Sequence, residues 1–217
     1  MTVDRTTSGR FIAFEGGEGS GKSTQARLLA DFLALRGIAV DLTREPGGTP
    51  GAEAIRALLL DPPGEGWGPE AEALLFAAAR ADHVARRIRP ALDAGGWVVC
   101  DRFVDSSRAY QGGAGGVGDA AVQALHTLGS GGLRPDLTIL VTVGPATAAL
   151  RLAERDGNQA DAIGGRGETY HRAVDAAFRQ LAAEDPDGFA VVDGEGTPDV
   201  VHARVIAALG DMLEAGA

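Results

Sequence analysis

The chain has 217 residues, which is the size of one compact domain and long enough to bury a hydrophobic core. It carries 20 Lys plus Arg against 30 Asp plus Glu, and the net charge of −10 argues against a protein that coats nucleic acid. The one cysteine, Cys100, excludes an internal disulfide scaffold. No apolar run approaches the roughly 18 residues of a membrane helix, and residues 1–10 lack the apolar core of a secretory signal. We therefore expect a cytoplasmic protein without nucleic-acid or membrane partners.

Short apolar segments alternate with longer amphipathic ones along the whole chain. In chain order we expect strands over residues 11–15, 38–43, 97–101, 137–143 and 189–192. Helices are expected over residues 22–36, 51–60, 69–94, 119–128, 145–155, 168–185 and 198–213. Pro90 should kink or divide the third of these helices, and the glycine-rich stretch 112–118 should be a polar loop.

This alternation predicts an α/β fold with a parallel five-stranded sheet covered by helices on both faces. Neither an internal repeat nor a linker interrupts residues 11–217, so we expect one domain there, preceded by a flexible tail over 1–10.

A phosphate-binding motif lies between the first strand and the first helix. Residues 16–23 read G-G-E-G-S-G-K-S, which satisfies the P-loop pattern G-x-x-x-x-G-K-[ST]. Its glycines let backbone N–H groups approach phosphate oxygens, and Lys22 would reach the β- and γ-phosphates of a nucleotide. Lys22 is the one lysine beside 19 arginines, which indicates a position where a compact point charge is needed. The predicted ATP-binding residues are Gly16, Gly17, Glu18, Gly19, Ser20, Gly21, Lys22, Ser23 and Thr24.

A metal ion is expected beside this loop. The third strand, W-V-V-C-D, ends in Asp101, which is the Walker B pattern of a carboxylate at the end of an apolar strand. The Ser23 hydroxyl and the Asp101 carboxylate are the predicted ligands of a Mg²⁺ ion that accompanies ATP.

Several arginines could hold the phosphate of an acceptor. Arg44, Arg56, Arg80 and Arg102 lie at the ends of predicted strands or on the adjoining helices, where a guanidinium could grip a phosphate with two hydrogen bonds.

Five motifs in order make the chain similar to bacterial thymidylate kinases over nearly its whole length. They are F-E-G-G-E-G-S-G-K-S-T at 14–24, T-R-E-P-G-G-T at 43–49, F-A-A-A-R at 76–80, D-R-F…S-S-R-A-Y-Q-G at 101–112 and R-P-D-L-T at 134–138. The resemblance implies the three-layer P-loop fold of nucleoside monophosphate kinases, with a mobile lid at about 156–167. It implies transfer of the γ-phosphoryl group of ATP to dTMP, which gives dTDP and ADP. It also implies a homodimer, with the apolar faces of the helices around 74–88 as the contact surface.

The resemblance assigns roles around the acceptor phosphate and sugar. Glu18 resembles the P-loop carboxylate that meets the deoxyribose 3′-hydroxyl and the metal shell. Arg44 and Arg102 match the grips on the acceptor phosphate, with Arg56 as a third. Tyr110 matches the ring that leaves no room for a 2′-hydroxyl.

The thymine base has its own matches. Phe76 resembles the aromatic residue that stacks on thymine, and Arg80 resembles the donor to its O4 atom. Ser107 and Gln111 occupy the positions that read the N3 edge. The Glu45–Pro46 bond matches a family position where a cis proline sets the chain that carries Arg44.

The lid departs from the family pattern. The family's Asp-Arg-apolar-Glu motif aligns with residues 161–164, where Ala162 and Gly164 replace the Arg and the Glu. Arg155, Arg166 or Arg172 could supply the missing charge, and we favour Arg166 because glycine-rich turns flank it. The predicted catalytic residues are therefore Lys22, Glu18, Arg102 and Arg166.

Two alternatives stay open at this stage. The chain could be a P-loop kinase of another nucleoside monophosphate, or a catalytically weak nucleotide-binding module. The four histidines, His83, His126, His171 and His202, show no metal-ligand spacing and are expected to be surface or packing residues. Glu15 and Asp105 are expected to be structural neighbours of the site, and Cys100 to be a core residue.

Overall fold

The computed structural model describes residues 9–156 and 162–213. Within them, five parallel strands form one sheet in the order β2-β3-β1-β4-β5. The strands are β1 (Phe11–Glu15), β2 (Val40–Arg44), β3 (Trp97–Asp101), β4 (Leu137–Thr142) and β5 (Phe189–Asp193). The predicted parallel five-stranded sheet is confirmed, and each predicted strand differs from the observed one by at most two residues at an end.

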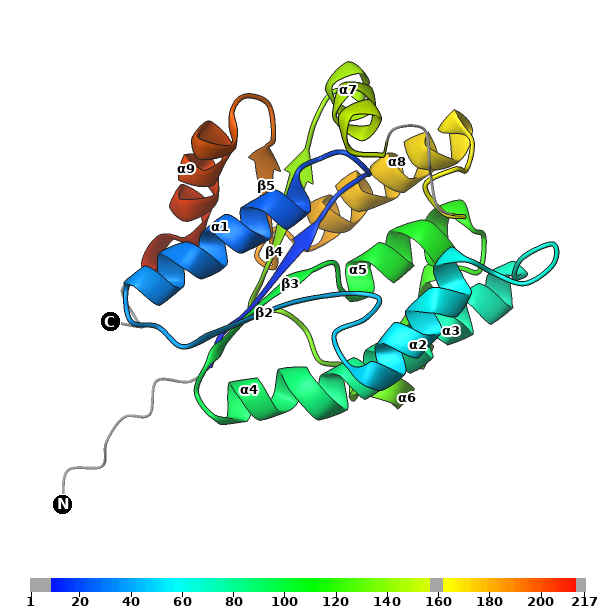
Figure 1. Cartoon of the computed structure of the whole chain (residues 1–217), viewed down its shortest axis with the longest axis horizontal. Coiled ribbons are helices and arrows are strands. Elements are labelled where there is room, and N and C mark those ends of the chain that lie inside the picture. Colours follow the sequence, from blue (N-terminus) through cyan, green and yellow to red (C-terminus); the bar gives the residue numbers. More distant parts are fainter. Residues whose placement is uncertain (1–8, 157–161, 214–217) are drawn as a thin grey trace.

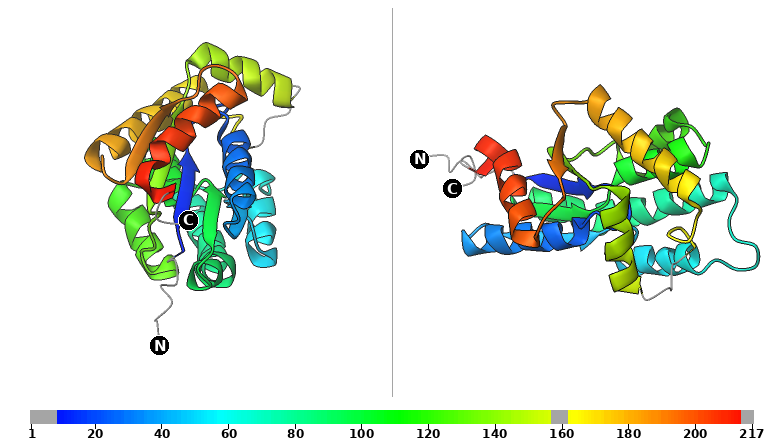
Figure 2. Two further views of the ribbon diagram at one scale, coloured as in Figure 1. Left: turned by 90° about the vertical axis from the view of Figure 1, so that its left-hand side faces the viewer. Right: turned by 90° about the horizontal axis from the view of Figure 1, so that it is seen from above.

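Helices cover both faces of the sheet (Figure 1). They are α1 (Lys22–Leu35), α2 (Pro50–Leu60), α3 (Pro69–His83), α4 (Arg89–Asp93), α5 (Val104–Ser107), α6 (Asp119–Ser130), α7 (Pro145–Asp156), α8 (Glu168–Glu184) and α9 (Pro198–Leu209). The blue α1 and the red α9 lie on one face, whereas α4 and α8 contact the other face (Figure 2). Helix α3 packs between α2 and α6 on the outside of this second layer.

Alternate residues of each central strand enter two different cores, because successive side chains of a strand point to opposite faces. Ile12 and Phe14 pack with α1 and α9, whereas Phe11 and Ala13 pack with the segment that precedes α4. All four are buried. Burial on both faces explains why the strands are apolar throughout and do not alternate with polar residues.

The long helix expected over 69–94 is divided, as Pro90 predicts. A π-helical segment, Val84–Ile88, follows α3, and Pro90 occupies the first turn of α4. A proline in that turn removes a backbone donor that a continuous α-helix would use, so the wider helical turn precedes it.

The stretch 112–118 was expected to be a loop, and this prediction is wrong for its first half. A π-helical segment, Arg108–Ala114, continues α5 and buries Tyr110, Gln111 and Gly112. The glycines in this stretch have low helix propensity and therefore predicted a loop. Packing against α6 and α8 stabilises the helical conformation despite that low propensity.

The parallel sheet brings three functional loops to one edge. The glycine-rich loop follows β1, Arg44 ends β2, and Arg102 follows β3, which lie side by side in the sheet. The expected tail lies outside the described residues except for Gly9 and Arg10, and the expected lid is described only outside 157–161. No helix in the described part of the chain is long and apolar enough to cross a membrane.

Candidate active site

The loop between β1 and α1 has the backbone geometry of a phosphate cradle. Gly16 has φ 140° and Gly21 has φ 94°, which side chains rarely allow, and a Cβ on Gly16 would lie 2.3 Å from the Val141 carbonyl oxygen. Lys22 is buried, and its Nζ donates to the Gly17 carbonyl at 2.7 Å and to Ser20 Oγ at 3.3 Å. Burial, with a smaller contribution from Arg102, lowers the pKa of Lys22 to about 8.

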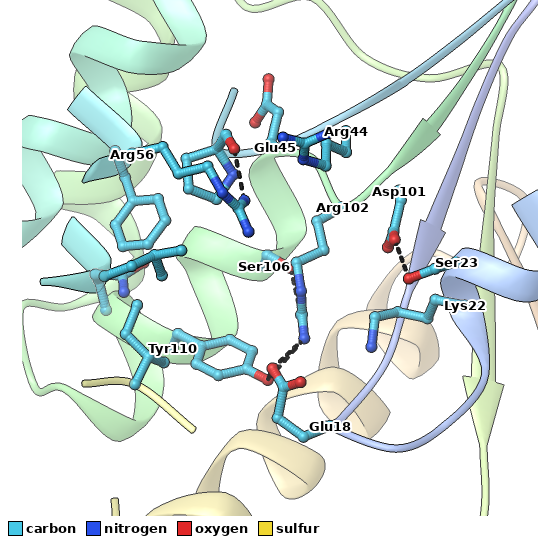
Figure 3. A pocket seen from close by; sticks show the side chains of 15 residues that line it. Glu18, Lys22, Ser23, Arg44, Glu45, Arg56, Asp101, Arg102, Ser106 and Tyr110 are labelled. Carbon is cyan, nitrogen blue, oxygen red and sulfur yellow. Dashed lines mark hydrogen bonds and ion pairs between the residues drawn. The ribbon is translucent and has the colours of Figure 1, made fainter. Parts of the chain in front are cut away.

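Ser23 and Asp101 meet beside Lys22, as Figure 3 shows. The Ser23 hydroxyl donates to Asp101 Oδ2, and Asp101 Oδ1 is buried without a hydrogen-bond partner in the described chain. An orphaned carboxylate oxygen next to a hydroxyl is a donor set that Mg²⁺ accepts when phosphates and water complete its shell. The described residues hold no group of three or more His, Cys, Asp or Glu that could bind a metal alone. The site therefore fits a Mg²⁺ ion carried by a nucleotide.

Arg102 lies at the centre of the site. Its φ of 71° is the one left-handed conformation of a non-glycine residue in the described chain. The backbone N–H of Arg102 donates to the Phe14 carbonyl oxygen. The guanidinium pairs with Glu18 and donates to Ser106 Oγ at 3.0 Å and to the Tyr110 hydroxyl oxygen at 3.2 Å. Burial acts to lower the pKa of Arg102, but Tyr110, Glu18 and Asp101 raise it, so the side chain stays positive.

Glu15 holds the turn that carries Arg102. Its carboxylate accepts the N–H groups of Phe103 at 2.8 Å and Ser106 at 2.9 Å, and the Ser106 hydroxyl at 2.6 Å. Burial raises the pKa of Glu15 to about 7, and Asp105 adds to this shift. Asp105 pairs with Arg108 at 3.0 Å and Arg134 at 2.9 Å. Both carboxylates are therefore structural neighbours of the site, as expected.

A cavity of about 350 Å³ opens in front of these residues. Most of the predicted site lines it: Glu18, Lys22, Ser23, Arg44, Arg56, Phe76, Asp101, Arg102, Tyr110 and Gln111. Glu45, Pro46, Leu60, Ser106 and Ile163 complete the lining. Arg80 and Ser107 do not line it and lie behind it, where both are buried.

The mouth of the cavity carries two of the arginines. Arg44 pairs with Glu53 at 3.0 Å and is half-exposed, and Arg56 Nη1 donates to the Pro46 carbonyl at 2.8 Å. The Glu45–Pro46 bond is cis, as predicted. Arg44, Arg56 and Arg102 therefore approach one end of the cavity from three different segments (Figure 3).

Arg80 is fixed behind the cavity, where it is buried. Its Nε donates to Glu45 Oε2 at 2.7 Å, and its Nη2 donates to Ser107 Oγ at 2.9 Å and to the Phe103 carbonyl at 3.2 Å. Its Nη1 makes no hydrogen bond to any described residue. A buried guanidinium thus keeps one donor nitrogen for a further acceptor.

Tyr110 and Gln111 form the wall below. The Tyr110 ring is 4% exposed, packs edge-on against Phe178 and Tyr170, and places its hydroxyl 3.2 Å from Glu18 Oε1. Burial raises the pKa of the Tyr110 hydroxyl, so it stays protonated. Gln111 Nε2 donates to Glu72 Oε1 at 2.9 Å.

The structure does not bring Arg166 to the P-loop. Its guanidinium pairs with Glu72, donates to the Tyr170 hydroxyl oxygen at 2.6 Å and lies over the Tyr170 ring. Arg172 pairs with Glu168 on the surface, and the side chain of Arg155 lies outside the described residues.

The sequence interpretation missed Arg151, which does contact the P-loop. Its Nη1 donates to the Ser20 carbonyl at 3.2 Å, and its Nη2 donates to the Gly194 carbonyl at 2.9 Å. No motif marks this arginine, because the residues that it joins are far apart in the sequence.

His83 was missed as well. It is fully buried and hydrogen-bonds both Thr43 and Glu45, so it is more than a packing residue. The available signal was its place three residues after Arg80, which puts both side chains on one side of α3. Cys100 is a core residue, as predicted.

Comparisons with known proteins agree with this geometry. The sequence model of the family described as thymidylate kinase matches residues 14–205. A thymidylate kinase of Rhizorhabdus wittichii is 55% identical over 205 residues, which are 94% of this chain and 99% of the relative. A thymidylate kinase of Chromohalobacter salexigens is 49% identical over 95% of this chain and 98% of the relative.

The fold agrees with a solved structure. The crystal structure of thymidylate kinase from Ehrlichia chaffeensis superimposes with a TM-score of 0.74 at 32% identity, over 93% of this chain and 99% of that one. The described sheet and its helices are those of a P-loop nucleoside monophosphate kinase. With the P-loop, the Walker B carboxylate and the arginine-lined cavity in place, the chain belongs to the thymidylate kinase family, enzymes that phosphorylate dTMP with ATP.

Proposed function

We propose that the 350 Å³ cavity binds dTMP, with its phosphate at the end of Arg44 and Arg102 and its thymine at the end of Arg80. The reaction is transfer of the γ-phosphoryl group of ATP to the 5′-phosphate of dTMP, which gives dTDP and ADP. One observation carries this orientation: a buried arginine behind the cavity keeps Nη1 without a partner among the described residues, whereas the P-loop lysine lines the cavity.

The phosphate end neutralises charge. Lys22 acts as the point charge on the donor phosphates, and Arg102 spans donor and acceptor because its guanidinium already reaches the Gly16 carbonyl at 3.3 Å and the cavity. Arg44 and Arg56 grip the acceptor phosphate, and Arg44 exchanges Glu53 for it. Glu18 meets the sugar 3′-hydroxyl.

The base end provides specificity. Phe76 stacks on thymine, and Arg80 Nη1 donates to its O4 atom. Gln111 reads the N3 edge from the cavity wall, whereas Ser107 acts through the hydrogen bond that it accepts from Arg80. The Tyr110 ring fills the space that a 2′-hydroxyl would need. A base without the O4 acceptor would leave a buried donor unpaired, which is how such sites discriminate strongly.

Ser23 and Asp101 would hold a Mg²⁺ ion bound to ATP, and this ion would neutralise charge on the phosphates. The remaining cradle residues, Gly16, Gly17, Gly19, Ser20, Gly21 and Thr24, present backbone or hydroxyl donors to the nucleotide.

In this proposal the Arg166 guanidinium breaks its ion pair with Glu72 and then stabilises the negative charge of the transferred phosphoryl group. We expect Arg166→Ala to lower kcat by about 10³, the lower end of the range for arginine fingers, with KM for dTMP within threefold of the unsubstituted enzyme. Arg151→Ala is the matched test of the arginine that already contacts Ser20. A large loss of kcat in Arg151→Ala and a small one in Arg166→Ala would transfer the role to Arg151.

The proposal includes an oligomeric state and a cellular location. The enzyme is a cytoplasmic homodimer of a single domain over residues 11–217, and the outer face of α3 forms the contact, where Leu74 is 56% exposed. Sedimentation at micromolar concentration tests the dimer, and a monomer there would contradict it.

The deciding experiment measures ADP production with ATP, Mg²⁺ and one of four acceptors: dTMP, dUMP, UMP or dCMP. Lys22→Ala is the blank. Turnover with dTMP well above the other acceptors supports the proposed cavity. A preference for another acceptor would make the enzyme a kinase of that monophosphate, and tight binding of both nucleotides without turnover would make the chain a nucleotide-binding module.

A further inference from the structure

A buried polar chain runs behind the cavity from β2 to the base end. Thr43 Oγ1 lies 2.7 Å from His83 Nε2, His83 Nδ1 lies 3.0 Å from Glu45 Oε1, and Arg80 Nε lies 2.7 Å from Glu45 Oε2. Arg80 then continues the chain to Ser107. Each of these side chains belongs to a residue that is at most 7% exposed. The chain therefore joins three separate segments, the end of β2 with the residues after it, α3 and α5, through buried residues.

The hydrogen-bond roles along this chain follow from the acceptor at its centre. Both oxygens of Glu45 accept, one from Arg80 and one from His83, so His83 Nδ1 carries the proton that it donates. In a neutral ring, His83 Nε2 then accepts the Thr43 hydroxyl proton. One carboxylate and one guanidinium balance in charge, and the histidine fixes the carboxylate from the side opposite to Arg80.

His83 has little freedom in this place. A Cβ on Gly48 would lie 2.5 Å from His83 Nε2 and 2.6 Å from Thr43 Oγ1, so the 43–49 loop closes tightly over the ring. Glu45 in turn lines the cavity beside Pro46 and follows Arg44. The ring thus holds a carboxylate that is shared by the base end and the phosphate end.

We infer that His83 is a positioning residue for base recognition: through Glu45 it fixes the plane of the Arg80 guanidinium, so that Nη1 points at the base. This inference rests on the proposed role of Arg80 at thymine O4. Two of the three guanidinium nitrogens are held by protein acceptors, and only a guanidinium whose plane is fixed presents the third at a defined angle. A histidine that merely packed would have no influence on which base is chosen.

Three substitutions separate the two ring nitrogens. His83→Asn keeps a donor near the place of Nδ1 and the bond to Glu45. His83→Gln reaches instead toward Thr43, at the place of Nε2, and loses the bond to Glu45. His83→Leu removes both. His126→Leu is the control, because His126 is also buried but bonds the Leu133 carbonyl and does not line the cavity.

The readout is the ratio of kcat/KM for dTMP to kcat/KM for dCMP, because dCMP carries an amino group where dTMP has O4. We expect His83→Leu and His83→Gln to lower this ratio about tenfold or more, the scale of one well-placed hydrogen bond. His83→Asn and His126→Leu should keep it within threefold, and KM for ATP should stay within twofold in all four variants.

Two comparisons decide the outcome. If Arg80→Met loses the dTMP preference and the folded His83→Leu and His83→Gln variants keep it, the inference about His83 is overturned and the proposed function stands. If Arg80→Met itself keeps the preference, the proposed role of Arg80 fails first. If His83→Leu does not fold, the Asn and Gln pair decides, and equal ratios in these two variants would overturn the inference.

Discussion

The two ends of the site are built differently. At the base end, Arg80, Glu45, His83 and Ser107 are buried and hydrogen-bond one another, which leaves Arg80 Nη1 without a partner among the described residues. At the phosphate end, Arg44 is half-exposed and pairs with Glu53, Ser23 is exposed, and Lys22 rests on a backbone carbonyl and a hydroxyl. In the proposed site, specificity would depend on side chains fixed by other side chains, whereas phosphate binding would depend on backbone geometry and on charges that exchange partners.

The difference follows from the two ligands. A base is recognised by single hydrogen-bond donors and acceptors, so a protein donor that points in the wrong direction cannot form its hydrogen bond. A phosphate carries several equivalent oxygens and a large charge, which tolerate cations that swing into place. The following predictions test this contrast, in order of the expected effect.

The largest effect is expected from Lys22→Ala. Loss of the ammonium group beside the transferred phosphoryl group should lower kcat by about 10²–10³, because a preorganised positive charge stabilises the negative charge that develops in the transition state. Steady-state ADP production at saturating dTMP measures this loss. Arg27→Ala, on the exposed side of the same helix, is the control and should stay within threefold. Similar losses in both variants would contradict a specific role for Lys22.

The next effect concerns stability at the base end. Arg80→Met leaves the buried Glu45 carboxylate without its guanidinium, and the free energy of unfolding should fall by about 3 kcal/mol. The double variant Arg80→Met with Glu45→Gln should recover at least half of this loss, because the uncompensated charge is gone. Urea denaturation measures both.

Arg86→Met is the matched control for a surface ion pair. Arg86 pairs with Asp82 one turn away and its side chain is 71% exposed, so its loss should change stability by about 0.5 kcal/mol or less. If Arg80→Met were no more destabilising than Arg86→Met, the contrast between a rigid base end and an exchangeable phosphate end would not hold.

A pH dependence is expected at the phosphate end. The pKa of Lys22 is about 8, below its unfolded value, and the charged form binds phosphate. Binding above pH 8 therefore requires uptake of a proton, and the affinity for ATP should fall by up to about tenfold per pH unit as pH rises beyond 8. Calorimetric titration between pH 7 and 9.5 measures it. Lys22→Ala should remove the dependence, and an affinity that stays flat in the unsubstituted enzyme would contradict the low pKa.

The smallest effect should come from Tyr110→Phe. The hydroxyl contacts Glu18 and Arg102 at 3.2 Å, and its loss should lower kcat/KM for dTMP by about fivefold. The preference for dUMP over UMP should not change, because the ring that fills the 2′ space remains. Tyr110→Ala should lose the preference for dUMP over UMP. If Tyr110→Phe also lost this preference, the hydroxyl and not the ring would be responsible for it.

Contiguous motifs made part of this site predictable. Residues 16–23 carry the loop, the cation and a proposed metal ligand within eight positions, and Asp101 ends an apolar strand. The apolar strands also fixed the sheet, since burial on both faces leaves a plain signal. The His83–Glu45–Arg80 chain was not predictable in the same way, because it exists only after β2, α3 and the segment after β3 have packed.

The lid shows the same limit. Arg166 was favoured as the lid arginine because glycine-rich turns flank it, but its partner Glu72 lies on α3, 94 positions away in sequence. Likewise, the π-helical segment Arg108–Ala114 depends on tertiary packing, which its glycine-rich sequence does not predict.

Arg102 has a consequence for engineering this enzyme. Its φ of 71° belongs to a conformation that disfavours L-residues by about 1–2 kcal/mol and that glycine adopts freely. A thermostabilising design that chose residues from backbone angles alone would replace Arg102 with glycine, and would lose the guanidinium that contacts Glu18, Ser106 and Tyr110. Arg102 occupies a conformation that costs folding free energy, so under its proposed role stability and turnover place opposite demands on this position.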